Sequence, residues 1–299
     1  MTMKTNFLAS LNNSSIKFIT SCSGMCSTTS TQITPSALFV GYFEKILTPE
    51  VRKAYKTIAF DLLVGQPGQT KKTMEDTCEK IIKLQPTVVQ TSLLAYKPWV
   101  NKASIRMVEE GPLPDFIGRK ELLDIINEKL DKAGYVRVAF ESYALPDDPM
   151  AIEAKKGQIH YGASGTQTGG RVNFVGVGSS TKGNLGDEYY SQNYYDLKSY
   201  KKCIDEGLFP TFRGMKLSQD DKIRQHATQQ FRSYFKIDFK QFEKNFEINP
   251  KEYFNKEIEY LGEMIKDGLV TVSNDSIEMT KLGRDFSQNI SNVFDIYDP

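Results

Sequence analysis

Histidine and cysteine are scarce in this chain of 299 residues, which contains two histidines and four cysteines. So few of these residues exclude a disulfide-rich secreted scaffold and a histidine-rich metal enzyme. Basic and acidic residues nearly balance, at 38 and 37, so the chain lacks the basic excess of a non-specific nucleic-acid binder. No apolar run reaches the ~18 residues that a membrane span needs. We expect a monomeric protein of the reducing cytoplasm, with neither membrane nor nucleic acid as a partner.

The N-terminal segment has no acidic residue before Glu44. The segment is rich in serine and threonine but has no arginine, so it does not fit a transit peptide, and polar residues interrupt any secretory signal. We interpret residues 1–43 as a weakly ordered tail or a mis-joined N-terminus. Cys22 and Cys26 lie in it, but an iron–sulfur cluster needs a third thiolate, and Thr29 stands at the next ligand position.

Short apolar runs alternate with amphipathic segments between residues 57 and 140. The pattern predicts strands at 57–64, 88–94 and 135–140, and helices at 70–84 and 116–133. This order is typical of βαβ units and predicts a parallel sheet with right-handed crossovers. Cys78 lies on the apolar face of the first helix, so we interpret it as a core residue. Residues 65–70 favour a plain turn over an anion site, because they lack the lysine of a Walker loop.

The rhythm changes beyond residue 145. We expect a helix at 150–156, a loop at 162–170 and a strand at 172–178. Ser218 and Asp221 predict a capped helix that ends near Phe235. A helix from Pro250, a hairpin at 269–280 and a last helix complete a layout like that of a winged helix. Its segment 238–244 carries as many acids as bases, which argues against DNA binding.

Several residues could carry chemistry, and each also has a structural interpretation. A carboxylate at the end of a buried strand, as we expect for Asp61, could bind ribose hydroxyls or an amino group, or could serve in a cap or salt bridge. Arg213 could grip a carboxylate with two hydrogen bonds or form a structural ion pair. We expect His160 to be structural, His226 to lie on the surface, and the tyrosines at 189–190 and 194–195 to be core residues.

At this point several segments resemble one family, the oxygen-independent coproporphyrinogen III oxidases, which are radical S-adenosylmethionine (SAM) enzymes. Residues 61–70 read D-L-L-V-G-Q-P-G-Q-T and resemble the family's D-L-[IL]-x-G-L-P-x-Q-T. Residues 143–148 resemble its F-A-x-P-D-D, residues 156–160 its E-G-x-L-H, and residues 176–180 its G-x-G-x-S loop. Weaker matches follow in order, so that the resemblance covers residues 57–295.

The resemblance implies an α/β fold: a partial radical-SAM-type β/α barrel at 44–190, followed by an α-rich, winged-helix-like C-terminal domain at 191–299. Family members decarboxylate two propionates of coproporphyrinogen III to vinyl groups in haem (porphyrin) biosynthesis. Their 5′-deoxyadenosyl radical arises when a [4Fe–4S] cluster cleaves SAM. By position, Asp61, Ala95 and Lys182 match residues that contact SAM, although Lys182 replaces an apolar residue.

The chain also departs from the family pattern. The C-x-x-x-C-x-x-C cluster loop and the glycine-rich strand that holds the methionine amino group are missing, Glu141-Ser142 replaces Asp-His, and the loop at 161–169 differs. We therefore expect no metal ligands and leave open whether the chain is an enzyme. The leading hypothesis is a truncated or divergent family member, inactive as written, with a tetrapyrrole as its ligand. The alternatives are a non-catalytic tetrapyrrole carrier, a diverged haem-modifying relative and a gene remnant.

Overall fold

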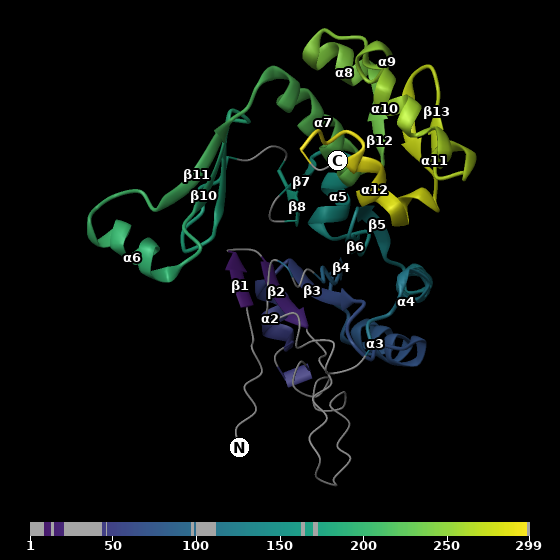
Figure 1. Ribbon diagram of the computed structural model, residues 1–299. Coiled ribbons are helices and arrows are strands. Elements are labelled where there is room, and N and C mark those ends of the chain that lie inside the picture. Colours follow the sequence, from purple (N-terminus) through teal and green to yellow (C-terminus); the bar gives the residue numbers. More distant parts are fainter. Residues whose placement is uncertain are drawn as a thin grey trace. The chain divides into compact units, whose positions relative to one another are not determined.

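The computed structural model describes residues 9–12, 15–20, 44–45, 47–96, 99, 112–162, 165–169 and 173–297. They belong to two compact units, Met1–Ile152 and Glu153–Pro299, and Figure 1 labels many of their elements. The expected sequence-domain boundary at residue 190 stays a prediction. The compact units divide earlier, because residues 182–193 pair with residues 211–216 in one sheet of the second unit. Among the described residues, no helix is long and apolar enough to cross a membrane.

The first unit is built on an open sheet with the strand order β1-β2-β3-β4-β6-β5. Its strands are β1 (Ala9–Asn12), β2 (Ser15–Thr20), β3 (Thr57–Val64), β4 (Val88–Leu93), β5 (Val136–Ala139) and β6 (Ser142–Ala144). Its helices are α2 (Pro49–Ala54), α3 (Lys71–Leu84) and α4 (Phe116–Lys132), and α5 (Pro149–Lys155) crosses into the second unit. The strands β3 and β4 run parallel, as the βαβ pattern predicts, and β2, which the pattern did not include, also pairs parallel with β3. Residues 9–12 and 15–20 form strands, and the weak order expected for residues 1–43 stays a prediction.

One face of β3 packs on the helices and the other does not. Its residues Ile58, Phe60, Leu62 and Val64 are buried in a core with α3 and α4. Because side chains alternate across a strand, Asp61 belongs to the opposite face. The core interpretation of Cys78 is confirmed: it lies 1% exposed in this cluster, where burial raises the pKa of its thiol to about 12.

The third expected strand lies elsewhere than the βαβ pattern predicts. A right-handed crossover through α4 should place β5 beside β4, but β6 occupies that position and pairs antiparallel with both. The chain turns back at Phe140 and Glu141, so the short hairpin strand inserts between the two parallel-running strands. The direction of β5 is therefore as expected, whereas its neighbour is not.

The described residues of the second unit form three small sheets and several helices. Its strands are β7 (Ile159–Gly162), β8 (Gly165–Thr168), β9 (Lys182–Leu185), β10 (Tyr189–Asn193), β11 (Thr211–Lys216), β12 (Lys236–Asp238), β13 (Val270–Val272) and β14 (Ser276–Met279). Its helices are α6 (Leu197–Asp205), α7 (Gln219–Tyr234), α8 (Phe239–Phe246), α9 (Pro250–Tyr253), α10 (Asn255–Tyr260), α11 (Gly262–Lys266), the 3-10 turn η2 (Gly283–Phe286) and α12 (Ser287–Asn292).

Two expectations for this unit are wrong. The stretch expected as a loop at 162–170 contributes to a hairpin, because β7 pairs with β8. The stretch expected as a strand at 172–178 forms, in its described part, only an isolated bridge between Phe174 and Asn184. The predicted hairpin at 269–280 is confirmed as β13 and β14, to which β12 adds a third strand. The helix expected from Pro250 is split into α9, α10 and α11.

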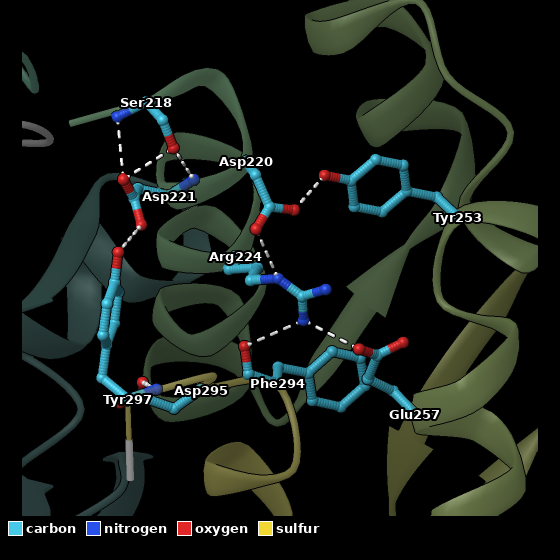
Figure 2. A network of polar contacts seen from close by, with 9 residues as sticks. All are labelled: Ser218, Asp220, Asp221, Arg224, Tyr253, Glu257, Phe294, Asp295 and Tyr297. Carbon is cyan, nitrogen blue, oxygen red and sulfur yellow. Dashed lines mark hydrogen bonds and ion pairs between the residues drawn. The ribbon is translucent and has the colours of Figure 1, made fainter. Parts of the chain in front are cut away.

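A polar network joins the start of α7 to the C-terminal segment (Figure 2). Ser218 and Asp221 form the predicted capping box, and the hydroxyl of Tyr297 donates to Asp221 Oδ1 at 2.8 Å. Arg224 pairs with Asp220 Oδ2 at 2.9 Å and with Glu257 Oε1 at 2.8 Å. The arginine and Glu257 side chains are only 16% and 12% exposed. One guanidinium therefore ties α7 to α10 over the aromatic core of the unit.

Replacing Arg224 with methionine should lower the free energy of unfolding by about 3 kcal/mol, because Glu257 keeps a buried charge without its cation. Urea denaturation followed by circular dichroism measures this, and hydrogen exchange locates the loss in α7. The matched control is Lys266→Met, whose pair with Glu263 is 72% and 81% exposed; it should change stability by about 0.5 kcal/mol or less. Equal effects from both variants would contradict a buried role for Arg224.

The second unit should lose stability in acid through Asp221. Burial raises the pKa of this carboxyl, but hydrogen bonds from Ser218 and Tyr297 outweigh it and hold the pKa below its ordinary value of 3.8. A lowered folded-state pKa stabilises the fold above the unfolded value, and that stability disappears as the pH falls through the folded value. Urea midpoints measured between pH 6 and pH 3 should fall less steeply in Tyr297→Phe than in the unchanged chain. An identical slope would rule out this linkage.

Candidate functional site

Asp61 lies within β3, as the fifth of its eight residues, and not at the strand's end as the sequence suggested. The strand continues to Val64, so the carboxylate does not reach the edge of the sheet. Asp61 lies outside the apolar core because side chains alternate along the strand. The neighbouring Phe60 and Leu62 belong to the core with α3 and α4, so Asp61 belongs to the opposite face of the sheet.

A row of polar side chains crosses this face. Asp61 pairs in register with Gln90 of β4, and Gln90 pairs with Ser142 of β6. Residues paired in register share a face, so the three side chains stand side by side on adjacent strands, roughly 5 Å apart. Ser142 is 1% exposed, and the other two are half-buried. We call Asp61, Gln90 and Ser142 the polar row.

Sequence reasoning missed two members of this row. Gln90 is the polar residue in the middle of a strand that begins Val-Val, and Ser142 stands where the resembling family carries histidine. Gln90 in an apolar strand indicates a polar face. Its pairing with Ser142 could not be predicted, because that register depends on the insertion of β6.

Ala95 lies beyond the end of β4, apart from the row. The backbone N–H of Leu94 donates to the carbonyl of Val64 at 2.8 Å, so the ladder between the two strands ends just before Ala95. Asp61 is level with Gln90, five residues before Ala95, which corresponds to roughly 16 Å along the strands. The structure therefore places Asp61 and Ala95 at different levels of neighbouring strands.

The turn between β3 and α3 is closed on itself. The side chain of Gln69 accepts from the N–H groups of Gly65 and Gln66, at 2.7 and 3.0 Å, and donates to the carbonyl of Leu63. Gly65 has a φ of +90°, and a Cβ there would lie 3.3 Å from Nε of Arg119. These amides are engaged within the turn, which agrees with a plain turn and not with an anion cradle.

Lys182 belongs to the second unit, in a sheet with the order β11-β10-β9. It pairs with Gln192, and Gln192 pairs with Arg213, so the three residues share one face. Arg213 donates from Nε and Nη2 to Gln192 Oε1, at 3.0 and 2.8 Å, and from Nη2 to the hydroxyl of Tyr195 at 3.2 Å. Two alternatives were open for Arg213, binding of a carboxylate and a structural ion pair. Among the described residues, Arg213 forms no ion pair.

The loop before Lys182 is held by one amide. Asn193 Nδ2 lies 3.0 Å from the carbonyls of Gly176 and Gly178 and 3.1 Å from Thr181 Oγ1. A Cβ on Gly176 would lie 2.5 Å from the carbonyl oxygen of Lys182. The glycine is therefore required for the loop to approach the strand, which fixes the backbone around Lys182.

The remaining candidates have structural surroundings. His160 is buried on β7. His226 is half-buried and not on the surface as expected, because its ring packs on Phe242 and Phe246 at centroid distances of 4.9 and 5.3 Å. Of the tyrosines expected in the core, Tyr189 and Tyr195 are exposed, because they lie at or beside the small β9–β11 sheet.

The cysteines provide no cluster within the described residues. Cys22 and Cys26 lie outside them, and Cys78 and Cys203 are single thiols. Among the residues with described positions, no group of three or more histidine, cysteine or acidic side chains could hold a metal ion.

Gly176→Ala should destabilise the second unit by about 1–3 kcal/mol, because the methyl group forces the loop away from β9. The matched control is Gly262→Ala, where an added Cβ meets nothing within 4 Å and should stabilise α11 by about 0.5–1 kcal/mol. Urea denaturation of the two variants measures both changes. Alanine variants of equal stability would show that the loop yields without cost.

Comparison with known proteins extends these observations. Residues 217–286 match the family model of the HemN C-terminal domain. The chain is 34% identical over 242 residues to the oxygen-independent coproporphyrinogen III oxidase of Helicobacter pylori, covering 81% of this chain and 52% of the relative. The enzyme of the same name from Synechocystis is 31% identical over 252 residues, or 83% of this chain and 54% of the relative.

A solved structure agrees with the sequence comparisons. The coproporphyrinogen III oxidase of Escherichia coli, described as a radical SAM enzyme, superposes with a TM-score of 0.78 and 26% identity, over 88% of this chain and 59% of that one. The chain spans about half the length of the curated relatives it matches. With the motif at residues 61–70 on β3 and its turn, these matches show that the chain is similar to the oxygen-independent coproporphyrinogen III oxidases over 81% of its own length.

Proposed function

We propose that this chain is an oxygen-independent coproporphyrinogen III oxidase-like protein of haem biosynthesis, a cytoplasmic monomer that binds SAM and a tetrapyrrole. The relatives are named for that oxidase, and the similar solved structure is that of a radical SAM enzyme. Since the chain spans about half of their length, its own activity, cofactors and substrate are part of the proposal.

The observation that carries the proposal is the polar row on the face of the sheet opposite α3 and α4. A carboxylate there accepts hydrogen bonds from hydroxyl or amino groups. A glutamine amide both donates and accepts, and so does a serine hydroxyl. The combination suits a nucleoside, whose ribose and base present donors and acceptors together. In this proposal Asp61 binds a hydroxyl or amino group of SAM, and Gln90 and Ser142 orient it.

Ala95 and Lys182 enter the proposal through their backbones. Ala95 follows the last ladder bond of β4, so its own peptide groups are not part of the strand pair. The carbonyl of Lys182 is set by its close approach to Gly176. Ala95 can therefore contribute main-chain contacts to SAM whatever its side chain, and the assignment of Lys182 to SAM rests on the family resemblance alone.

The iron–sulfur cluster stands apart from these residues. Cys78 is a protonated core thiol, and Cys203 is the other cysteine that the structure describes. The described part of the chain thus offers no set of three thiolates, and we assign no step of a reaction to a cluster.

Replacing Asp61 with asparagine tests the proposal directly. The change removes the negative charge and replaces one carboxylate oxygen with an amide nitrogen. It should raise the dissociation constant of SAM about tenfold, as expected for a lost charge-assisted hydrogen bond. Isothermal titration calorimetry measures the constant. The matched control is Asp76→Asn, which makes the same change at an exposed position of α3 and should leave SAM affinity within twofold.

The result also separates the alternatives. Binding of coproporphyrin III without binding of SAM would favour a tetrapyrrole carrier over a SAM-dependent protein. Binding of neither ligand would overturn the proposal.

A further inference from the structure

Two cationic side chains share one face of the β9–β10–β11 sheet. Lys182 and Arg213 both pair with Gln192, which lies between them on the central strand. Two strand spacings of about 4.8 Å place their Cα atoms roughly 10 Å apart. We call Lys182, Gln192 and Arg213 the cationic row.

The arginine is held in place by neutral groups. Gln192 is 7% exposed, and its Oε1 accepts from Arg213 and from the hydroxyl of Tyr195, while its Nε2 donates to the carbonyl of Ser180 at 3.2 Å. Tyr195 also contacts the half-exposed ring of Phe212, with the ring centroids 6.2 Å apart. The guanidinium of Arg213 is thus held in a fixed orientation by neutral partners, and no acidic side chain neutralises its charge.

Both charges are uncompensated within the described chain. Some other cations of the unit do pair with acids, as Lys222 does with Glu188 and Lys236 with Glu278. None of the acids with described positions forms an ion pair with Lys182 or Arg213, and both cations are exposed. An oriented guanidinium and a second cation on the same face suit a ligand with two separated carboxylates.

We propose that Lys182 and Arg213 bind propionate carboxylates of the tetrapyrrole, with the rings of Tyr195 and Phe212 beside its apolar body. The inference rests on the proposed function and extends it to the side of the substrate. SAM also has a carboxylate, but only one, whereas the cationic row offers two separated cations. A tetrapyrrole with several propionates satisfies both.

The experiment is a fluorescence titration of the full chain with coproporphyrin III, which carries the same propionates as the porphyrinogen. Lys182→Gln and Arg213→Gln should each weaken binding about tenfold, and the double variant more, because each loses a charge-assisted hydrogen bond. Lys216→Gln is the matched control. It lies on the same strand as Arg213 but on the other face, so the dissociation constant should stay within twofold.

Coproporphyrin III tetramethyl ester, which has no carboxylates, serves as the second ligand. Its affinity should be equal for the unchanged chain and the double variant. The proposal for the cationic row would be overturned if the double variant lost affinity for the ester as much as for coproporphyrin III. It would also be overturned if Lys216→Gln weakened coproporphyrin III binding as much as Lys182→Gln or Arg213→Gln, or if the double variant bound coproporphyrin III normally. A loss of SAM affinity in the double variant, with coproporphyrin III binding unchanged, would reassign the two cations to SAM.

Failure of the proposed function looks different. In that case the unchanged chain binds neither coproporphyrin III nor its ester, whereas failure of the cationic row alone leaves the unchanged chain able to bind. Circular dichroism of each variant confirms the fold, and Lys182→Gln, at an exposed position away from the Tyr195 contacts, keeps the test valid if Arg213→Gln unfolds.

Discussion

The pleat of β3 is the constraint on which the first unit depends. Four of its residues must face α3 and α4 to close the core, and the remaining positions are then committed to the other face. A shift of the strand by one residue would bury Asp61 among leucine and isoleucine side chains and expose Phe60. The cost of burying an unpaired carboxylate in such a core therefore fixes the register, and with it the neighbours of Asp61 on β4 and β6.

In the second unit the comparable constraint is electrostatic. Arg224 reaches an acid on its own helix and another on α10, and it lies within 3.4 Å of the carbonyl of Phe294. Phe294 in turn packs on Phe231 and Phe254 in the aromatic core. The ion pairs of Arg224 and the aromatic rings beneath them thus connect the same three segments: α7, the short helices after Pro250 and the C-terminal segment. These contacts can hold the short helices in place although they do not form one continuous helix.

Sequence patterns predicted the local elements well where one face is apolar. The strand at 57–64, the helices α3 and α4, and the capped helix from Ser218 all follow from period and caps. The errors concern pairing between segments. Nothing in the composition of residues 140–144 shows that a three-residue strand displaces β5 from β4, and a glycine-rich stretch reads as a loop until its partner strand is known. The site follows the same division: Asp61 was visible in the sequence, whereas Gln90, Ser142 and Gln192 became neighbours only through register.

The burial of Cys78 has a consequence for thiol chemistry. Burial raises the pKa of this thiol to about 12, so the thiolate is a very minor species at pH 7. Alkylating reagents and peroxide attack the thiolate, and the surrounding core also excludes them. Thiol oxidation of the folded chain must therefore act on another cysteine, and Cys78 can serve as an internal standard that stays unmodified until the first unit unfolds.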